Sequence, residues 1–312
     1  MSCFSPLTAW RGRRQPNGKR SIVWRESEAV GSLVDAKLRL PCGQCVGCRL
    51  ERSRQWAMRC VHEASLYKRN CFVTLTFGDP HLPEGGGLSV KTFQLFMKRL
   101  RKHAGACKVR FFHCGEYGEK LGRPHYHACL FNWDFADKVL WQVRDGVPLY
   151  TSKRLSQLWK FGFSTVGDVT FESAAYVARY VMKKVTGAAG PSHYEGKKPE
   201  YVTMSRRPGI GKGWYLKFKS DVYPHDFLVM NGHKVRPPKF YDSQFELTDP
   251  EMFSRLKARR VARASVKEES FNDVLGKVQL IDANCDARLA VKEEVLKSRI
   301  SQLVRPLEGS NG

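Results

Sequence analysis

The chain has 312 residues, long enough for one large domain or two ordinary ones, and its 42% hydrophobic content is compatible with a buried core. Lys and Arg total 53 against 30 Asp and Glu, and this net charge of +23 predicts binding to a polyanion, most readily nucleic acid, with solubility alone as the alternative. The absence of a long apolar stretch and of a signal-peptide core argues against a membrane or secreted protein and predicts a cytoplasmic one.

The first predicted elements are a basic leader and a helix. Residues 1–44 form the leader, with one short strand at most, and residues 50–67 show apolar positions at helical spacing. A C-x₂-C-x₂-C motif, Cys42, Cys45 and Cys48, precedes this helix and suggests a structural Zn²⁺ site, with Cys60 or His62 as a fourth ligand. The alternatives are an iron–sulfur cluster or ordinary buried thiols.

An alternation of strands and helices follows. Residues 71–77 read as a strand, residues 79–87 as a Pro/Gly loop and residues 90–103 as a helix. Two strand-like runs, residues 109–116 and 125–131, are predicted to form an antiparallel hairpin.

The later segments complete the predicted fold. A short helix (residues 152–160), a strand (163–169) and a helix (171–185) stopped by Gly187 follow. The fold class is therefore α+β, a central antiparallel sheet with flanking helices over residues 45–245. Residues 246–312 read as a charged helical extension that either binds DNA or a partner, or is a solvated or partly disordered tail.

His125 and His127 begin the strand of residues 125–131 and share one face, about 6.6 Å apart along it. The preceding strand offers Glu116 as a third metal ligand, with His113 as a competitor. Two imidazoles and a carboxylate suit Mn²⁺ or Mg²⁺, with Zn²⁺ as an alternative. Otherwise the two histidines are satisfied core residues.

A pair of tyrosines offers a nucleophile. Tyr176 and Tyr180 lie four apart in the helix of residues 171–185, on one face, and Lys183 and Lys184 follow one turn later. A tyrosine oxygen can attack a phosphodiester and hold the phosphoryl group covalently, and the lysines can neutralise phosphate or lower the phenol pKa. The alternative is an amphipathic helix whose tyrosines only pack.

These motifs resemble a known family. In chain order, FVTLTF, RPHYHACLF and YVARYVMKK resemble the three motifs of HUH replication endonucleases. Over residues 40–242 the chain is more closely similar to the replication initiators of gokushoviruses, single-stranded-DNA bacteriophages of the Microviridae, in PCGQCVGCRLERSRQWAMRCVHEA, FFHCGEYGEKLGRPHYH, FESAAYVARYVMKKVTG and YVTMSRRPGIGKGW.

The resemblance implies an HUH endonuclease-like fold and a rolling-circle initiator that nicks single-stranded origin DNA through a tyrosine. It implies His125 and His127 as metal ligands, with Glu116 less directly supported, and Tyr176 and Tyr180 as nucleophiles. Histidines before tyrosines is the order of replication initiators, whereas relaxases have the tyrosine first. The initiator would leave a 3′-OH primer for a host polymerase in the host bacterial cytoplasm. Because the chain has no Walker motif, a host helicase would unwind the circular phage genome.

DNA contacts are expected around these motifs. The best single segment is SRRPGIGKGW, with Arg206, Arg207, Lys212 and Trp214. Further candidates are Arg52, Arg54, Arg99 and Arg101, and Tyr215 as a second base-stacking aromatic. Two other functions stay open: a non-catalytic, metal-stabilised nucleic-acid-binding or packaging protein, and an HUH transposase-like strand transferase.

Overall fold

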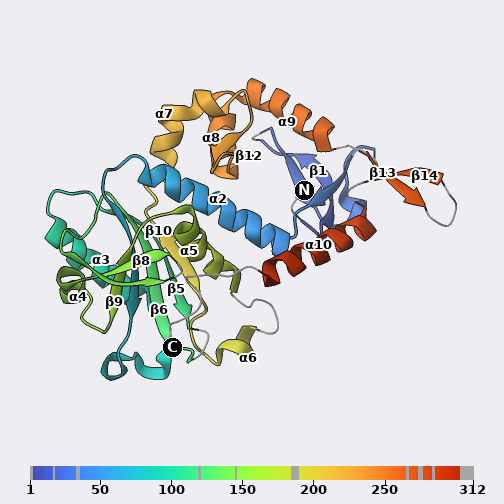
Figure 1. The fold of residues 1–312 in the computed structure, drawn as a ribbon. Coiled ribbons are helices and arrows are strands. Elements are labelled where there is room, and N and C mark those ends of the chain that lie inside the picture. Colours follow the sequence, from blue (N-terminus) through green and yellow to red (C-terminus); the bar gives the residue numbers. More distant parts are fainter. Residues whose placement is uncertain are drawn as a thin grey trace. The chain divides into compact units, whose positions relative to one another are not determined.

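The structure is a computed structural model that describes residues 3–16, 18–32, 36–118, 121–144, 146–183, 190–264, 267–272, 277–282 and 285–302 (Figure 1). The chain divides into two compact units, Met1–Glu51 with Ala258–Leu303, and Arg52–Lys257 with Val304–Gly312. Among the described helices, none has the length and apolar character that crossing a membrane requires.

The larger unit is built on a seven-stranded sheet in which every neighbouring pair is antiparallel. Its order is β10 (Tyr201–Met204), β5 (Arg110–Tyr117), β6 (Pro124–Phe131), β4 (Asn70–Thr76), β9 (Ser164–Gly167), β8 (Val147–Ser152) and β7 (Lys138–Arg144). The predicted α+β class, the central antiparallel sheet and the β5–β6 hairpin are confirmed. The β7–β8 hairpin and β10 are additions that the sequence analysis did not anticipate.

Helices α3 (Val90–Ala104) and α4 (Lys153–Leu158) cover one face of this sheet. The apolar positions of α3 recur at helical spacing, and the Ser89 side chain accepts a hydrogen bond from the Thr92 N–H at the start of the helix. Phe93 and Phe96 of α3 are fully buried against Leu75 of β4 and its neighbours. The predicted helices of residues 90–103 and 152–160 are thus confirmed.

Helices α2 (Val46–Ala64) and α5 (Phe171–Lys183) pack on the opposite face. Ala57 of α2 and Val177 of α5 are fully buried there against Phe72 and Phe131 of the sheet. Because β6 is covered on both sides, all eight of its residues are buried. The strand therefore reads as a nearly continuous apolar run in which any polar side chain is conspicuous.

A third core follows the sheet in sequence. Helices α7 (Lys212–Val222), α8 (Lys239–Thr248) and α9 (Pro250–Ala264) form it with β11 (Leu228–Met230) and β12 (His233–Val235). Short elements of the larger unit are η2 (Asp79–His81), η3 (Glu84–Gly86) and α6 (Gly190–Tyr194). Gly187, the predicted stop of α5, lies outside the described residues.

The smaller unit contains a three-stranded antiparallel sheet, ordered β2 (Arg20–Val23), β1 (Leu7–Arg14) and β3 (Lys37–Leu40), with η1 (Glu26–Glu28). The sequence analysis expected one strand at most here. These strands escaped notice because most of their residues are partly or fully exposed, so no apolar alternation marks them.

The C-terminal segment contains the expected helices, α9 and α10 (Asp286–Ser301), but also a strand pair. β13 (Lys267–Asn272) and β14 (Lys277–Asp282) form an antiparallel pair between them. The prediction of a helical extension is therefore correct for the helices and incomplete for this hairpin.

Candidate active site

The histidine pair of β6 lies beneath α5 on the face that α2 and α5 cover. His125 is 3% exposed and His127 is 2% exposed. Glu116 of β5 is directly opposite His125 in the register, and its carboxylate reaches diagonally to His127, with Oε1 2.6 Å from Nε2. The Thr74 hydroxyl on β4 lies 3.0 Å from the other ring nitrogen of His127, Nδ1. Two neighbouring strands therefore fix the orientation of the His127 ring.

His125 is buried without a hydrogen-bond partner at either ring nitrogen. Burial, with smaller contributions from His127 and Arg123, lowers the pKa of His125 to about 4. The imidazole is therefore uncharged at neutral pH and has a free lone pair. A buried polar group without a partner costs free energy, which a bound cation would recover.

Tyr176 joins this group from α5. Its side chain is 3% exposed, and its hydroxyl donates a hydrogen bond to Oε1 of Glu116 over 3.2 Å. Its ring meets the His127 ring edge-on, with centroids 4.9 Å apart. A phenol hydroxyl, a carboxylate and an imidazole thus meet at one buried point, although they come from three separate elements.

The start of α5 is fixed by a reciprocal cap. The Thr170 N–H donates to Ser173 Oγ over 2.9 Å, and the Ser173 N–H donates to Thr170 Oγ1 over 3.1 Å. Two N–H groups that the first helical turn would leave unpaired are satisfied in this way. Since Tyr176 lies within the next turn, the cap sets where its hydroxyl falls.

The remaining predicted residues of α5 are only partly described. Tyr180 lies four residues after Tyr176, about 6 Å further along the helix axis, and Lys183 ends α5. The side chains of Tyr180 and Lys183 and all of Lys184 lie outside the described residues. Their roles stay predictions.

His113, the competing third ligand, faces the other side of the sheet. Its ring stacks on Phe93 of α3 with centroids 3.4 Å apart, and its Nδ1 lies 2.8 Å from Thr203 Oγ1. In one strand, residues 113 and 116 point to opposite faces, so only one of them can meet the histidine pair. The register selects Glu116, and the proposal of His113 as a ligand beside His125 is wrong.

The segment predicted to bind DNA, residues 205–211, is a loop after β10 with buried anchors. Nε of Arg110 lies 2.5 Å from Oε1 of Glu63, and its guanidinium also donates to the Pro208 carbonyl over 2.8 Å. The Gly211 N–H donates to Oε2 of the same Glu63 over 2.7 Å. Gly211 has φ +78°, and a Cβ there would lie 2.7 Å from a tyrosine hydroxyl, so glycine is required.

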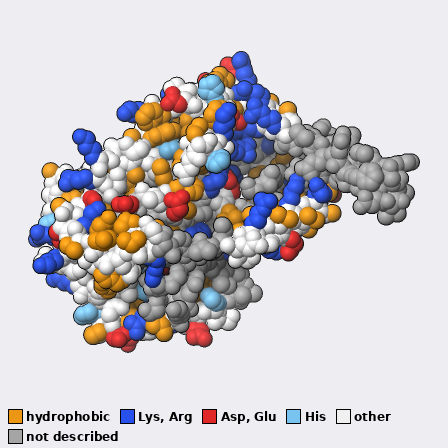
Figure 2. All heavy atoms as spheres, viewed as in Figure 1, with side chains coloured by type: hydrophobic (Ala, Val, Ile, Leu, Met, Phe, Trp, Pro, Cys, Tyr) orange, Lys and Arg blue, Asp and Glu red, His pale blue; other side chains and the backbone are white. Residues whose placement is uncertain are grey.

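This loop does not meet the histidine pair. Met204, its last strand neighbour, pairs with Phe112, four residues from Glu116 and about 13 Å along the strand. Arg206 and Arg207 are exposed, and Lys212 is half-buried at the start of α7. Lysine and arginine side chains are otherwise spread over the visible face of the molecule (Figure 2).

The two aromatic candidates of α7 are already engaged. Trp214 stacks on His62 with ring centroids 3.6 Å apart, and Tyr215 is 1% exposed. Tyr215 is therefore not available to stack on unpaired bases. Trp214 is half-buried, and its prediction as a DNA contact stays untested.

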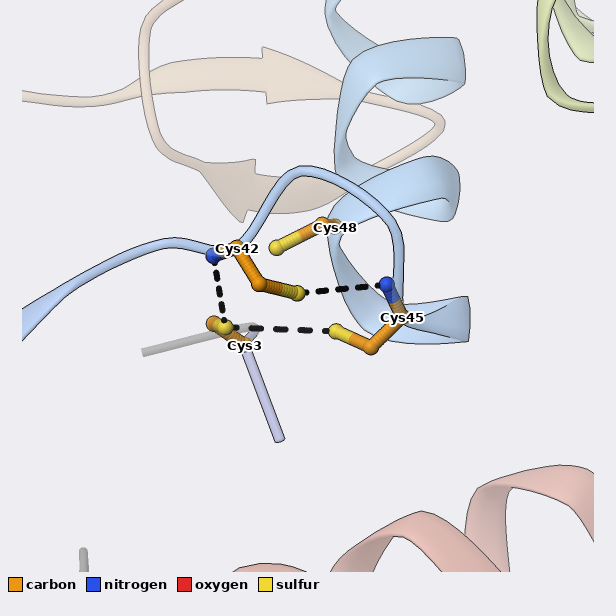
Figure 3. Close-up of side chains that lie close together, drawn as sticks. All are labelled: Cys3, Cys42, Cys45 and Cys48. Atoms are coloured by element: carbon orange, nitrogen blue, oxygen red, sulfur yellow. Dashed lines mark hydrogen bonds between the residues drawn. The ribbon is translucent and has the colours of Figure 1, made fainter. Parts of the chain in front are cut away.

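The cysteine motif gathers a fourth sulfur that the sequence analysis did not consider. Cys42, Cys45 and Cys48 meet Cys3, and all four Sγ atoms lie within 4.8 Å of one another (Figure 3). Cys60, predicted as the fourth ligand, is instead fully buried in the core of the larger unit. His62, the other alternative, stacks on Trp214.

A spare cysteine at the N-terminus, Cys3, was the available signal. Among the residues that the structure describes, these four cysteines are the only set of three or more His, Cys, Asp or Glu whose ligand atoms converge this closely. The metal role of His125, His127 and Glu116 thus stays a prediction.

Comparisons with known proteins give a consistent result. Residues 70–185 match the model of the replication-associated protein ORF2 family. The chain is 30% identical to replication-associated protein VP4 of Bdellovibrio phage phiMH2K, over 99% of this chain and 100% of that protein. It is 32% identical to replication-associated protein ORF2 of Spiroplasma virus 4, over 86% of each. Replication-associated protein ORF4 of Chlamydia phage 1 is 30% identical over 72% of this chain and 60% of that protein. No solved structure matches the chain significantly.

Proposed function

The chain belongs to the replication-associated protein family of Microviridae-type phages, and on that premise we propose that it initiates rolling-circle replication by nicking single-stranded origin DNA. The observation that carries the proposal is the buried contact of Tyr176 with Glu116 and His127. A phenol held against a carboxylate is a nucleophile next to its proton acceptor. We assign this chemistry to residues 45–245, with an HUH endonuclease-like sheet.

The reaction is a phosphoryl transfer to tyrosine. Oη of Tyr176 attacks the scissile phosphorus, and its proton passes to Oε1 of Glu116, 3.2 Å away. The P–O3′ bond breaks, and the leaving oxygen becomes a 3′-OH. The downstream strand stays on the protein as a 5′-phosphotyrosine, which conserves the bond energy so that a 3′-OH can later reverse the step.

A divalent cation fits the same residues. His125 has two unpartnered ring nitrogens, and His127 and Glu116 complete a set of two imidazoles and one carboxylate that suits Mg²⁺ or Mn²⁺. When bound, such an ion supplies charge stabilisation at the scissile phosphate. The low pKa of His125 keeps its imidazole in the neutral form that a ligand needs.

The second tyrosine extends the cycle. Tyr180 would attack the regenerated origin after one round, while the freed 3′-OH closes the released circle. Lys183 and Lys184, one turn further, would neutralise phosphate. A host polymerase would extend the primer, and a host helicase would open the duplex, because the chain has no Walker motif of its own.

The test is a cleavage assay on single-stranded origin fragments with Mg²⁺ or Mn²⁺. DNA labelled at its 3′ end should run on a denaturing gel as a covalent protein adduct, whereas DNA labelled at its 5′ end should give a shorter free product that a polymerase extends. EDTA, His125→Ala and the Tyr176→Phe/Tyr180→Phe double change should each abolish both products.

The matched control is Tyr150→Phe, a half-buried tyrosine of β8 outside the site, which should nick normally. Tight binding without an adduct across metals and origin fragments would overturn the proposal in favour of a non-catalytic DNA-binding protein. If Tyr180→Phe alone nicks, joins and recycles normally, the two-nucleophile cycle is wrong, although Tyr176 keeps its role.

A further inference from the structure

The four cysteines of the smaller unit form a site separate from the proposed nicking chemistry. Cys3 precedes β1, Cys42 and Cys45 lie in the turn between β3 and α2, and Cys48 is in the first turn of α2. Their sulfur atoms turn toward one another, as the close-up shows (Figure 3). Cys3 is 1% exposed. Four thiols from two distant parts of the chain thus converge, and their positions do not depend on the larger unit.

The sulfur spacing suits a metal rather than a disulfide. Sγ of Cys45 lies 3.9 Å from Sγ of Cys3, and all four cysteines are free thiols. A disulfide needs about 2.05 Å between its sulfurs. Four sulfurs around Zn²⁺ at about 2.3 Å stand on a tetrahedron whose edges are about 3.8 Å long. The observed spacing is close to that edge.

Backbone N–H groups already point at the sulfurs. Cys42 Sγ accepts from the N–H groups of Gln44 and Cys45 over 3.4 and 3.3 Å. Cys45 Sγ accepts from the Phe4 N–H over 3.3 Å, and Cys3 Sγ accepts from the Cys42 N–H over 3.2 Å. Gly43, with φ +75°, makes the tight turn that aims these donors. Such bonds stabilise thiolates, the form that binds metal.

We propose that Cys3, Cys42, Cys45 and Cys48 bind one structural Zn²⁺ ion. Four thiolates in a closed tetrahedral set favour zinc and leave no open position for substrate, which separates this site from a catalytic one. Binding converts four thiols and Zn²⁺ into a tetrathiolate with a net charge of −2 and releases the four thiol protons.

The ion clips the N-terminus to the start of α2. The strands of the smaller unit are mostly partly or fully exposed, so its three-stranded sheet buries little apolar surface on its own. A small unit of this kind commonly gains its stability from a metal. The zinc therefore holds β1 and β3 against the helix start, and Cys3 is the ligand that makes this connection.

The experiment measures metal in the full chain, purified without chelator. Mass spectrometry should find about one zinc and no stoichiometric iron per chain. Replacing zinc by Co²⁺ should give the visible bands of tetrahedral cobalt and a thiolate-to-cobalt charge-transfer band in the near ultraviolet. Cys3→Ser should lower zinc affinity at least tenfold in competition with a chromophoric chelator, whereas Cys285→Ser, a free thiol of the same unit, should leave it unchanged.

A second measurement uses the unaltered chain, in case Cys3→Ser does not fold. The four cluster thiols should resist alkylation until a strong chelator removes the metal, while Cys285 reacts at the same rate before and after. Iron with acid-labile sulfide, a Cys3–Cys45 disulfide in freshly reduced protein, or the absence of zinc uptake would each overturn the proposal. Loss of zinc in Cys60→Ser but not in Cys3→Ser would also overturn it.

Discussion

His127 is held at both ring nitrogens, which is unusual for a side chain on a fully buried strand. Nε2 faces Glu116 at 2.6 Å, and Nδ1 faces the Thr74 hydroxyl at 3.0 Å. A histidine buried only for packing needs no such partners on two different strands. Glu116 in turn accepts from Tyr176, so one carboxylate links the candidate ligand to the candidate nucleophile.

Glu116→Gln tests this link. The amide keeps the size of the side chain but cannot take up the phenol proton, so we expect single-turnover nicking to fall about 10²- to 10⁴-fold. DNA affinity should stay unchanged. Single-turnover cleavage on labelled origin DNA and a binding titration measure the two quantities.

Glu200→Gln is the control, because Glu200 is also buried and also accepts from a tyrosine hydroxyl, that of Tyr194. It should leave nicking within about twofold of normal. Equal losses in both variants would show that the effect comes from disturbed packing rather than from Glu116.

His62 is a second buried histidine, away from the site. It stacks on Trp214, and its Nδ1 lies 2.8 Å from the Tyr241 hydroxyl. Burial lowers its pKa from 6.5 to about 4. The unfolded chain therefore binds the proton more tightly, so the stability from this group is complete above pH 6.5 and is lost as the pH falls toward 4.

We expect His62 alone to make the free energy of unfolding about 2 kcal/mol lower at pH 5 than at pH 7.5, since a difference of one pKa unit corresponds to about 1.4 kcal/mol. Urea unfolding at both pH values should show a correspondingly weaker pH dependence in His62→Gln. The exposed His103→Gln should behave as the unaltered chain does. A pH dependence unchanged by His62→Gln would contradict the prediction.

At the scale of elements, α5 links the fold to the site. It packs on β5, β6 and β10, and its position along the sheet decides where Tyr176 meets Glu116. A further anchor is the Ser53 hydroxyl of α2, which donates to the Ala175 carbonyl over 3.0 Å. Both the N-terminal cap and this bond act on the turn that carries Tyr176.

Thr170→Ala removes one half of the cap and leaves the Ser173 N–H without its acceptor. We expect a loss of about 1 kcal/mol in the free energy of unfolding, the usual cost of a lost N-cap. Thr170→Ser, which keeps the hydroxyl, should recover most of it. Thermal and urea unfolding of the three proteins compare them, and an unchanged stability in Thr170→Ala would mean that the cap contributes nothing.

At the scale of the whole molecule, the charge of +23 predicts electrostatic DNA binding. The logarithm of the association constant for single-stranded DNA should fall linearly with the logarithm of salt concentration, with a slope of about −0.7 for each phosphate contact. The exposed Arg206 and Arg207 are placed to make two such contacts.

The Arg206→Gln/Arg207→Gln double change should therefore reduce the magnitude of this slope by about 1.4. Lys153→Gln/Arg154→Gln removes the same charge from α4, which covers the opposite sheet face from the histidine pair, and serves as the control. Fluorescence titrations at several salt concentrations give both slopes. Equal slopes in the two variants would mean that the loop makes no specific phosphate contact.

Local patterns were enough to predict much of the larger unit. The apolar alternation of β4, the helical spacing of Phe93, Phe96 and Leu100 in α3, and the hairpin of β5 and β6 are all confirmed. Each of these signals depends on residues a few positions apart, where periodicity of 2.0 or 3.6 is directly visible. The same parity placed His125 and His127 on one face, as the structure has them.

The sequence by itself thus determined which elements form and which side chains share a face. The tertiary structure alone decided that Glu116 rather than His113 meets His127, that Tyr176 donates to the same carboxylate, and that Cys3 joins the cysteine motif. These outcomes depend on strand register and on contacts between distant residues. The cost of closing such loops and the packing that repays it belong to the whole chain, so no local pattern contains them.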